Sequence, residues 1–110
     1  MAEPVEIVVR RARNDDREQV FEVESKSTPR LSYVPKVFDM FLSDETGEFL
    51  VAEVNECLVA CGKFTVVPDG SAWLETLRVI PEYQGLGIGK RFYERFFEIA
   101  RQKGVPKMRM

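Results

Sequence analysis

Histidine is absent from the 110-residue chain. This absence excludes Ser-His-Asp and Cys-His catalytic systems within the chain, and also zinc sites of the H-E-x-x-H type. Any general base must therefore be a carboxylate, a tyrosine, a cysteine, a lysine or a water molecule.

Cysteine is scarce, with Cys57 and Cys61 as its only occurrences. Both belong to an apolar stretch that is typical of a strand, where they would share one face but lie too far apart for an easy disulfide. Two thiols cannot complete a tetrahedral zinc site without other ligands. We therefore interpret both as small buried apolar residues and predict no metal site.

Long apolar runs are also missing, because no segment approaches the roughly 20 apolar residues that a membrane span needs. The segment Met1 to Arg13 is charged and alternating, so we do not interpret it as a secretory signal. With 45% hydrophobic residues, 31% charged residues and a net charge of −2, the composition predicts one globular domain over residues 1–110. We expect no general affinity for nucleic acids or membranes, and a cytoplasmic location by default.

The charge is unevenly distributed along the chain. Residues 1–83 carry 9 Lys/Arg and 16 Asp/Glu, whereas residues 84–110 carry 7 Lys/Arg and 2 Asp/Glu. The basic segment begins where a glycine-rich turn begins, which suits a phosphate-bearing ligand. On charge alone, an ordinary solvated helix with basic side chains explains the pattern as well or better.

Hydrophobic periodicity predicts eight elements in the order β-α-α-β-β-β-α-β, an α+β or mixed α/β arrangement. Asp15 and Glu18 have the spacing of a capping box at the start of the first helix, and Pro35 fits the first turn of the second. Asn55-Glu56 and the turn at 68–70 would join the three central strands as hairpins. The expected elements are strand 6–13, helix 15–26, helix 35–44, strand 49–54, strand 57–67, strand 71–80, helix 88–103 and strand 105–110.

Three glycines, Gly85, Gly87 and Gly89, lie between the strand that ends at Ile80 and the last helix. Helix N-termini expose unpaired N–H groups, and glycines let a ligand approach the backbone closely, so the segment predicts a phosphate cradle. A tight strand-to-helix corner is the alternative. A Walker A loop is excluded because positions 84 and 91 are Gln and Arg, and the G-x-G-x-G spacing departs from a dinucleotide fingerprint.

The spacing Gln84-x-x-Gly87-x-Gly89, preceded by Leu77-x-Val79-x-Pro81, resembles the signature motif of the GNAT acetyltransferases. The predicted order of elements is also similar to that of the family, so the resemblance covers almost the whole chain. It implies a GNAT-like acyl-CoA N-acyltransferase fold with acetyl-CoA as the acetyl donor. Because the sequence ends inside the expected fifth strand, we expect the fold to be truncated there.

The resemblance also implies cofactor-binding residues. Backbone N–H groups of the glycine-rich turn would hold the pyrophosphate of coenzyme A, and the main chain of Leu77 and Val79 would hydrogen-bond the pantetheine arm. Lys90 and Arg91 would add charge near the phosphates, or would be ordinary exposed helix charges. The full set of cofactor-binding positions is Leu77, Arg78, Val79, Gln84, Gly85, Leu86, Gly87, Ile88, Gly89 and Lys90.

Glu75 is the candidate catalytic base, since acetyl transfer requires a protonated amine to lose a proton. We expect it on the same strand face as Leu77 and Val79, beside the acetyl group. Some polyamine and aminosugar acetyltransferases of the family are similar in carrying a Glu at the matching place. The alternative is an exposed or salt-bridged strand glutamate. A set of aromatic residues is interpreted as core, with an acceptor pocket as the alternative: Tyr33, Phe38 and Trp73.

These expectations leave two functions open. The first is an N-acetyltransferase that moves acetyl from acetyl-CoA to a primary amine, on a small molecule or a peptide, by direct attack. The second is a catalytically incomplete CoA-binding or dimerising GNAT-like fragment, because an exposed strand edge favours a homodimer. The resemblance implies a tyrosine acid beyond Met110, and Tyr93 is not assigned that role.

Overall fold

The computed structural model describes residues 6–30, 32–106, 108 and 109. The element order that the sequence predicts is confirmed, with short 3₁₀ turns added before the first and third helices. Lys107 and Met110, which we placed in the last strand, lie outside the described residues. The elements are β1 (Ile7–Arg11), η1 (Asn14–Asp16), α1 (Arg17–Ser27), α2 (Val34–Ser43), β2 (Glu48–Val54), β3 (Cys57–Val66), β4 (Ala72–Val79), η2 (Pro81–Tyr83), α3 (Ile88–Lys103) and β5 (Met108–Arg109).

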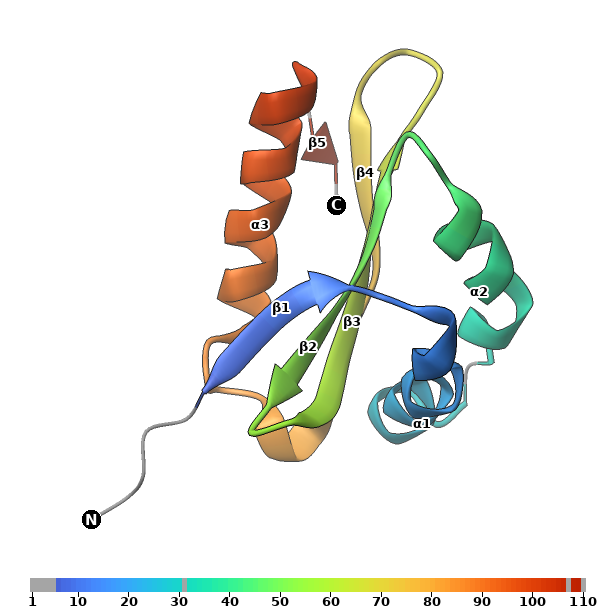
Figure 1. Cartoon of the computed structure of the whole chain (residues 1–110), viewed down its shortest axis with the longest axis vertical. Coiled ribbons are helices and arrows are strands. Elements are labelled where there is room, and N and C mark those ends of the chain that lie inside the picture. Colours follow the sequence, from blue (N-terminus) through green and yellow to red (C-terminus); the bar gives the residue numbers. More distant parts are fainter. Residues whose placement is uncertain (1–5, 31, 107, 110) are drawn as a thin grey trace.

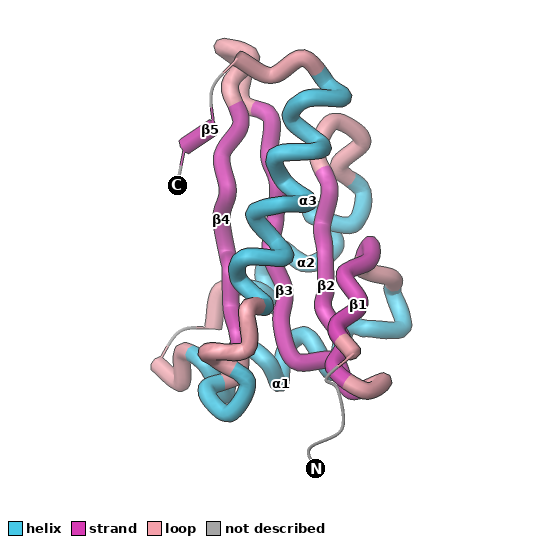
Figure 2. The backbone as a smooth tube through the Cα atoms, turned by 90° about the vertical axis from the view of Figure 1, so that its left-hand side faces the viewer, coloured by secondary structure: helices cyan, strands magenta, loops and turns pink. Residues whose placement is uncertain are grey.

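The strands form one sheet in the order β1-β2-β3-β4-β5. The first four strands are antiparallel neighbours, whereas β5 runs parallel to β4 because α3 carries the chain back along the sheet. Helix α3 covers one face of the sheet, and α1 and α2 lie on the other (Figures 1 and 2). Both faces are therefore covered, and the two central strands are apolar along most of their length.

The core has an aromatic layer on each face of the sheet. On one face Phe38 of α2 lies edge-on to Phe49 of β2, with 5.6 Å between ring centroids. On the other face Phe96 of α3 stacks on Phe64 of β3 at 6.1 Å. Each of these four rings is at least 96% buried, and burying such a side chain contributes about 1.5–3 kcal/mol. The two helical layers thus hold β2 and β3 from opposite sides.

Two local signals in the sequence give the predicted geometry. Asn55 and Glu56 both have positive φ, 50° and 71°, so they form a tight hairpin turn between β2 and β3. Gly104 follows α3 with a φ of 69° and is its C-terminal cap.

The start of α1 differs from the prediction. The N-cap residue is Asp16 rather than Asp15, and its side chain does not cap α1. Its carboxylate instead accepts the Arg13 N–H at the start of η1 at 2.7 Å and binds the Arg10 guanidinium at 2.8 Å. The hydrogen bond from Arg10 is the main reason that the pKa of Asp16 is lowered, and the Arg13 N–H adds to it while burial opposes. The Asp15–Glu18 box is therefore replaced by a link between β1 and α1.

The two cysteines also differ from each other. Cys61 is fully buried, as predicted, but Cys57 is exposed, so the prediction was wrong for Cys57. Cys57 is the first residue of β3, directly after the hairpin turn. The β2–β3 register shifts between Ala52 and Glu53, so strict alternation no longer relates Cys57 to Cys61.

Two searches of the described residues were negative. In that part of the chain none of the helices combines the length and apolar character needed to cross a membrane. Among the same residues, no group of three or more His, Cys, Asp or Glu side chains could hold a metal ion.

Candidate active site

A cavity of about 370 Å³ lies where β4 passes through η2 and the glycine-rich loop into α3. We call it the donor cavity. It brings together six of the predicted cofactor-binding residues and adds Tyr83, which sequence reasoning missed. Its lining consists of Val79, Tyr83, Gln84, Gly85, Gly87, Ile88 and Gly89.

The loop is shaped by its own sequence. Pro81 begins η2 directly after Ile80, because proline cannot donate to the sheet and fits the start of a helical turn. The Gln84 side-chain amide donates to the Val79 carbonyl at 3.2 Å and closes the turn. Gly85 and Gly87 both have a φ of 85°, a backbone region that other residues rarely adopt.

The N-terminus of α3 is left open to an anion. Its N-cap is Gly87, which has no side chain to cap the helix, and its first turn has no acidic residue. The first helical hydrogen bond runs from the Arg91 N–H to the Gly87 carbonyl at 3.1 Å. The three N–H groups between these residues therefore lack helical acceptors, and they coincide with the positive end of the helix dipole.

Gly89 differs from Gly85 and Gly87 in its backbone. It does not have positive φ, and a Cβ added there would meet nothing within 4 Å. Neither backbone strain nor crowding inside the protein therefore requires glycine at this position. A glycine here leaves room for a ligand to approach the helix N-terminus closely, so the residues present fit a bound pyrophosphate.

The other predicted cofactor-binding residues lie outside the lining of this cavity. Leu86 is 44% exposed on the loop, and Lys90 is exposed in the first turn of α3. The Arg78 side chain is directed to α1, with its Nε 3.8 Å from a Glu24 carboxylate oxygen. Roles for these residues, and for the main chain of Leu77, stay predictions.

Glu75 and Leu77 lie on opposite faces of β4, so the prediction that they share a face was wrong. Arg78 pairs with Cys61 and Glu75 pairs with Lys63, which sets Thr76 and Leu77 opposite the single residue Gly62. This is a β-bulge, and Thr76 has a φ of 60°. The extra residue reverses the alternation of side chains.

The contacts on each face agree with the bulge. Leu77 lies on the α3 side of the sheet. A Cβ placed on Gly62 would be 3.4 Å from a methyl group of Leu77, and the rings of Phe92 and Phe96 of α3 lie next to the same point. Glu75 lies on the α2 side, in the lining of a cavity that includes Phe41.

This second cavity, of about 360 Å³, lies between α2 and the β3–β4 pair, and we call it the α2 cavity. Both cavities touch β4, one near its end and one in its middle. The lining includes one lysine, two carboxylates and apolar side chains from α2: Met40, Phe41, Asp44, Lys63, Thr65 and Glu75.

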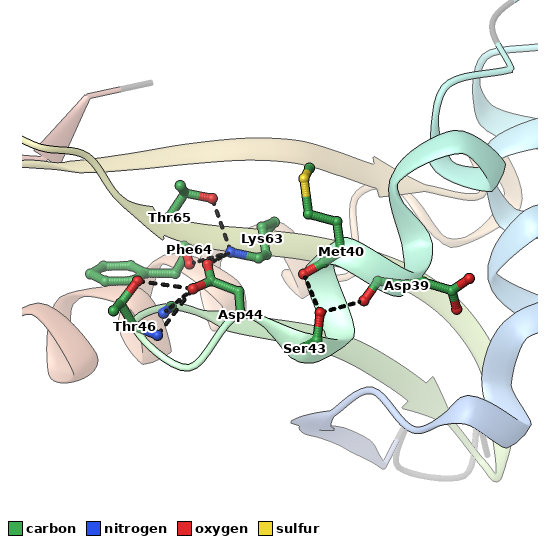
Figure 3. Close-up of polar contacts among 9 residues, drawn as sticks. Asp39, Met40, Ser43, Asp44, Thr46, Lys63, Phe64 and Thr65 are labelled. Atoms are coloured by element: carbon green, nitrogen blue, oxygen red, sulfur yellow. Dashed lines mark hydrogen bonds and ion pairs between the residues drawn. The ribbon is translucent and has the colours of Figure 1, made fainter.

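Lys63 is only 1% exposed, although it carries a charge. Its ammonium donates to the Asp44 carboxylate at 2.6 Å, and to the Phe64 carbonyl and the Thr65 hydroxyl at 3.0 Å each (Figure 3). Asp44 also accepts the N–H and hydroxyl of Thr46. Burial tends to raise the pKa of Asp44, but the hydrogen bonds from Lys63 and Thr46 outweigh it and lower the pKa to about 2.

Glu75 differs from Asp44 in having no partner among the described residues. No hydrogen bond or ion pair from the described residues reaches its carboxylate. Its side chain is half-buried at the α2 cavity, which leaves it free for a ligand.

The three aromatic residues considered for an acceptor pocket have different environments. Phe38 is fully buried, as predicted for core. Tyr33 and Trp73 are 43% and 49% exposed, so the core interpretation was wrong for them. Sequence reasoning also missed Lys63, whose signal was a lone charge within the apolar run that begins at Cys57.

The fold is similar to that of solved acetyltransferases. The ribosomal-protein-S18-alanine N-acetyltransferase from Escherichia coli shares 21% identity and a TM-score of 0.77, with 91% of this chain covered. A Bacillus anthracis protein described as a streptothricin acetyltransferase, solved in complex with acetyl coenzyme A, shares 16% identity and a TM-score of 0.76, over 94% of this chain and 73% of that protein. The present chain spans 63% of the length of the Escherichia coli enzyme.

The fold also occurs in a protein with a different description. A transcriptional regulator from Bacillus halodurans C-125 shares 21% identity and a TM-score of 0.76, over 94% of this chain and 80% of that protein. At these identities, the similarities show a common fold.

Comparison of the sequence with protein-family models identifies the family of the chain. None of the curated protein sequences matches the chain significantly. The family model described as "Acetyltransferase (GNAT) family" matches residues 9–110, which include the end of β1, the central hairpins, the glycine-rich loop and α3. Because this match extends over nearly the whole chain and agrees with the motif at Gln84–Gly89, the chain belongs to the GNAT acetyltransferase family.

Proposed function

We propose that this protein is an N-acetyltransferase that transfers the acetyl group of acetyl-CoA to a primary amine by direct attack. The observation that carries the proposal is the open N-terminus of α3 beside the donor cavity, at the end of the strand that also bears Glu75. Bound acetyl-CoA would supply the acetyl group as a thioester.

The donor cavity would hold the pyrophosphate on N–H groups of the glycine-rich loop and of the first turn of α3. From there β4 leads back towards Glu75, which lies four residues before Val79, or about 13 Å at the usual strand rise. Among the described residues β5 pairs only with Ala72 and Trp73, so main-chain groups further along β4 are available to a pantetheine arm on that side. The bulge at Thr76 lies within this span.

Glu75 would act as the base. Its free carboxylate accepts a proton from the ammonium of the acceptor, and the amine nitrogen then forms a bond to the acetyl carbonyl carbon. The carbon–sulfur bond breaks, the nitrogen loses its second proton to solvent to give the neutral amide, and the sulfur leaves as a thiolate that takes a proton from solvent. No side chain is assigned to this last protonation.

The state of the cysteines supports direct attack rather than transfer through an acyl-enzyme. Burial raises the pKa of the Cys61 thiol to about 12, so almost no thiolate forms at neutral pH. Cys57 lies at the start of β3 and contributes to a different cavity, with Leu58 and Ile80.

Two measurements test the proposal. Calorimetry with acetyl-CoA should show saturable binding, and addition of primary amines should release free coenzyme A thiol. Binding without thiol release from any amine would instead favour a CoA-binding module without turnover. No binding at all would favour a GNAT-like domain that acts through dimerisation, and would contradict the proposal.

A further inference from the structure

Among the described residues, the lining of the α2 cavity has one lysine, Lys63, and that lysine is not available to a ligand. An ammonium group has three hydrogens, and Lys63 uses them on Asp44, Phe64 and Thr65. With 1% exposure, the group has no surface left for an additional anion. A carboxylate on a ligand would therefore find no free cation in this lining.

The polar groups that remain favour a cation. Lys63 and Asp44 neutralise one another at 2.6 Å, so the net charge of the lining comes from Glu75. The Thr65 hydroxyl accepts from Lys63 with one lone pair, and its second lone pair can accept from an ammonium on a ligand. An ammonium near Glu75 is attracted, whereas a carboxylate attached to the neighbouring carbon is repelled.

Apolar surface surrounds these groups. Met40 is 59% exposed although it lines the cavity, and Phe41 lies beside it on α2. Trp73 is directly opposite Thr65 across the β3–β4 pair, on the same face as Glu75, and is 49% exposed. Exposed large apolar side chains beside a cavity indicate contact with an apolar ligand.

We propose that the α2 cavity is selective for primary amines that carry an apolar body and no carboxylate. The ammonium lies at Glu75 and the apolar body contacts Met40 and Phe41. This inference rests on the proposed function, because it names the class of acceptor for the same site. It excludes free amino acids as preferred acceptors while allowing their amides and decarboxylated counterparts.

Three ligands that share the phenethylamine skeleton test it: phenethylamine, phenylalanine and phenylalaninamide, of which the last two are also matched in size. Each is titrated into the isotope-labelled 110-residue chain, and dissociation constants come from the NMR shifts of Met40, Thr65, Glu75 and the Trp73 indole. We expect phenylalanine to bind at least tenfold more weakly than phenethylamine. Phenylalaninamide should bind within a few-fold of phenethylamine, after correction for the fraction of protonated amine, since it keeps the bulk but not the negative charge.

The variant Glu75→Gln supplies the matched test. Removing the carboxylate should reduce the preference for phenethylamine over phenylalanine to less than about threefold, because the repulsion has gone. Glu94→Gln, an exposed carboxamide substitution on α3, should leave the preference unchanged. Equal binding of phenylalanine and phenethylamine to the wild type, or shifts confined to other residues, would overturn the inference.

This test is separate from that of the proposed function. If the binding preference is found but no amine releases thiol from acetyl-CoA, the transfer activity fails and the selectivity stands. If thiol is released equally well with phenylalanine, the transfer activity stands and the selectivity fails.

Discussion

Lys63 and Glu75 are directly opposite one another across the β3–β4 pair, yet the Lys63 ammonium pairs with Asp44, at the end of α2. The pairing takes the lysine out of reach of a ligand and leaves the glutamate without a counter-charge from the described part of the chain. The same ion pair attaches the α2–β2 loop to the sheet. This ion pair therefore forms part of the lining of the α2 cavity and leaves Glu75 as the source of the net charge of that lining.

The first prediction concerns the base. Glu75→Gln should lower kcat by about 10²-fold or more, since a positioned general base contributes about 10²–10⁴-fold. The dissociation constant of acetyl-CoA should stay nearly unchanged, because Glu75 lies in the middle of β4, away from the glycine-rich loop. Thiol-release kinetics measure the first quantity and calorimetry the second.

Glu94→Gln is the control for this substitution, and it should leave both quantities unchanged. If Glu75→Gln retains wild-type turnover across the pH range, Glu75 is not the base.

The second prediction tests the donor cavity. Gly87→Glu should weaken acetyl-CoA binding by more than about tenfold, a loss of about 1.4 kcal/mol, because the new carboxylate occupies the anion position at the helix N-terminus. Gly70→Glu is closely matched to it. The two glycines have φ of 85° and 86°, and a Cβ at either meets nothing within 4 Å.

Both variants should therefore lose a similar amount of stability, about 1–2 kcal/mol, from the strained backbone. Only the variant at position 87 should lose affinity for the cofactor. Equal affinity in the two variants would show that the nucleotide binds elsewhere.

A third prediction uses the Lys63–Asp44 pair. The pKa of Asp44 is lowered from its ordinary 3.8 to about 2, so its contribution to stability is complete above about pH 4 and is lost as the pH falls through 2. Asp44→Asn leaves Lys63 buried without a counter-charge, and should lower the free energy of unfolding at pH 7 by about 3 kcal/mol.

Lowering the pH should then reduce the difference in the free energy of unfolding between the wild type and Asp44→Asn. Between pH 5 and pH 2, the free energy of unfolding of the wild type should fall by about 1–2 kcal/mol more than that of Asp44→Asn, as measured by urea unfolding. Asp39→Asn removes an exposed partner of Arg17 and should change stability by less than about 1 kcal/mol at either pH. A constant difference between wild type and Asp44→Asn over this range would contradict the assigned pKa.

Much of the fold could be predicted because its signals are local. Periodicity, the Asn55–Glu56 turn and Gly104 each depend on a few adjacent residues, and the loop at Gln84–Gly89 encodes its own geometry. The face of Glu75 could not be predicted, because it depends on a bulge that arises only when β4 pairs with β3 around Gly62. The role of Lys63 depends equally on Asp44, which is 19 residues away in the sequence.

The fourth prediction concerns that bulge. Thr76 combines a φ of 60°, which is unfavourable for a β-branched residue, with a buried hydroxyl that has no hydrogen-bond partner among the described residues. Replacing Thr76 with glycine would remove the backbone strain and the unsatisfied hydroxyl, each of which costs about 1–3 kcal/mol. It would also cost about 0.5–1 kcal/mol in backbone entropy and would lose the contacts of the side chain.

We therefore expect Thr76→Gly to change the free energy of unfolding by less than about 1 kcal/mol. Thr65→Gly, at a strand position without positive φ and with a hydrogen bond to Lys63, should lower it by about 1–2 kcal/mol. Equal losses in the two variants would mean that Thr76 is not strained.

The last prediction distinguishes the two cysteines by their reactivity. Cys57 is exposed, whereas Cys61 is fully buried, with a pKa raised by burial to about 12 and its thiol near the Thr76 carbonyl. Because the thiolate is the reactive form, a thiol reagent at pH 8 should modify one group per native chain and two per unfolded chain. Cys57→Ser should remove the reaction of the native protein, which also makes this variant the proper background for thiol-release assays. If both thiols of the native chain react at the same rate, β3 opens readily and Cys61 does not belong to a stable core.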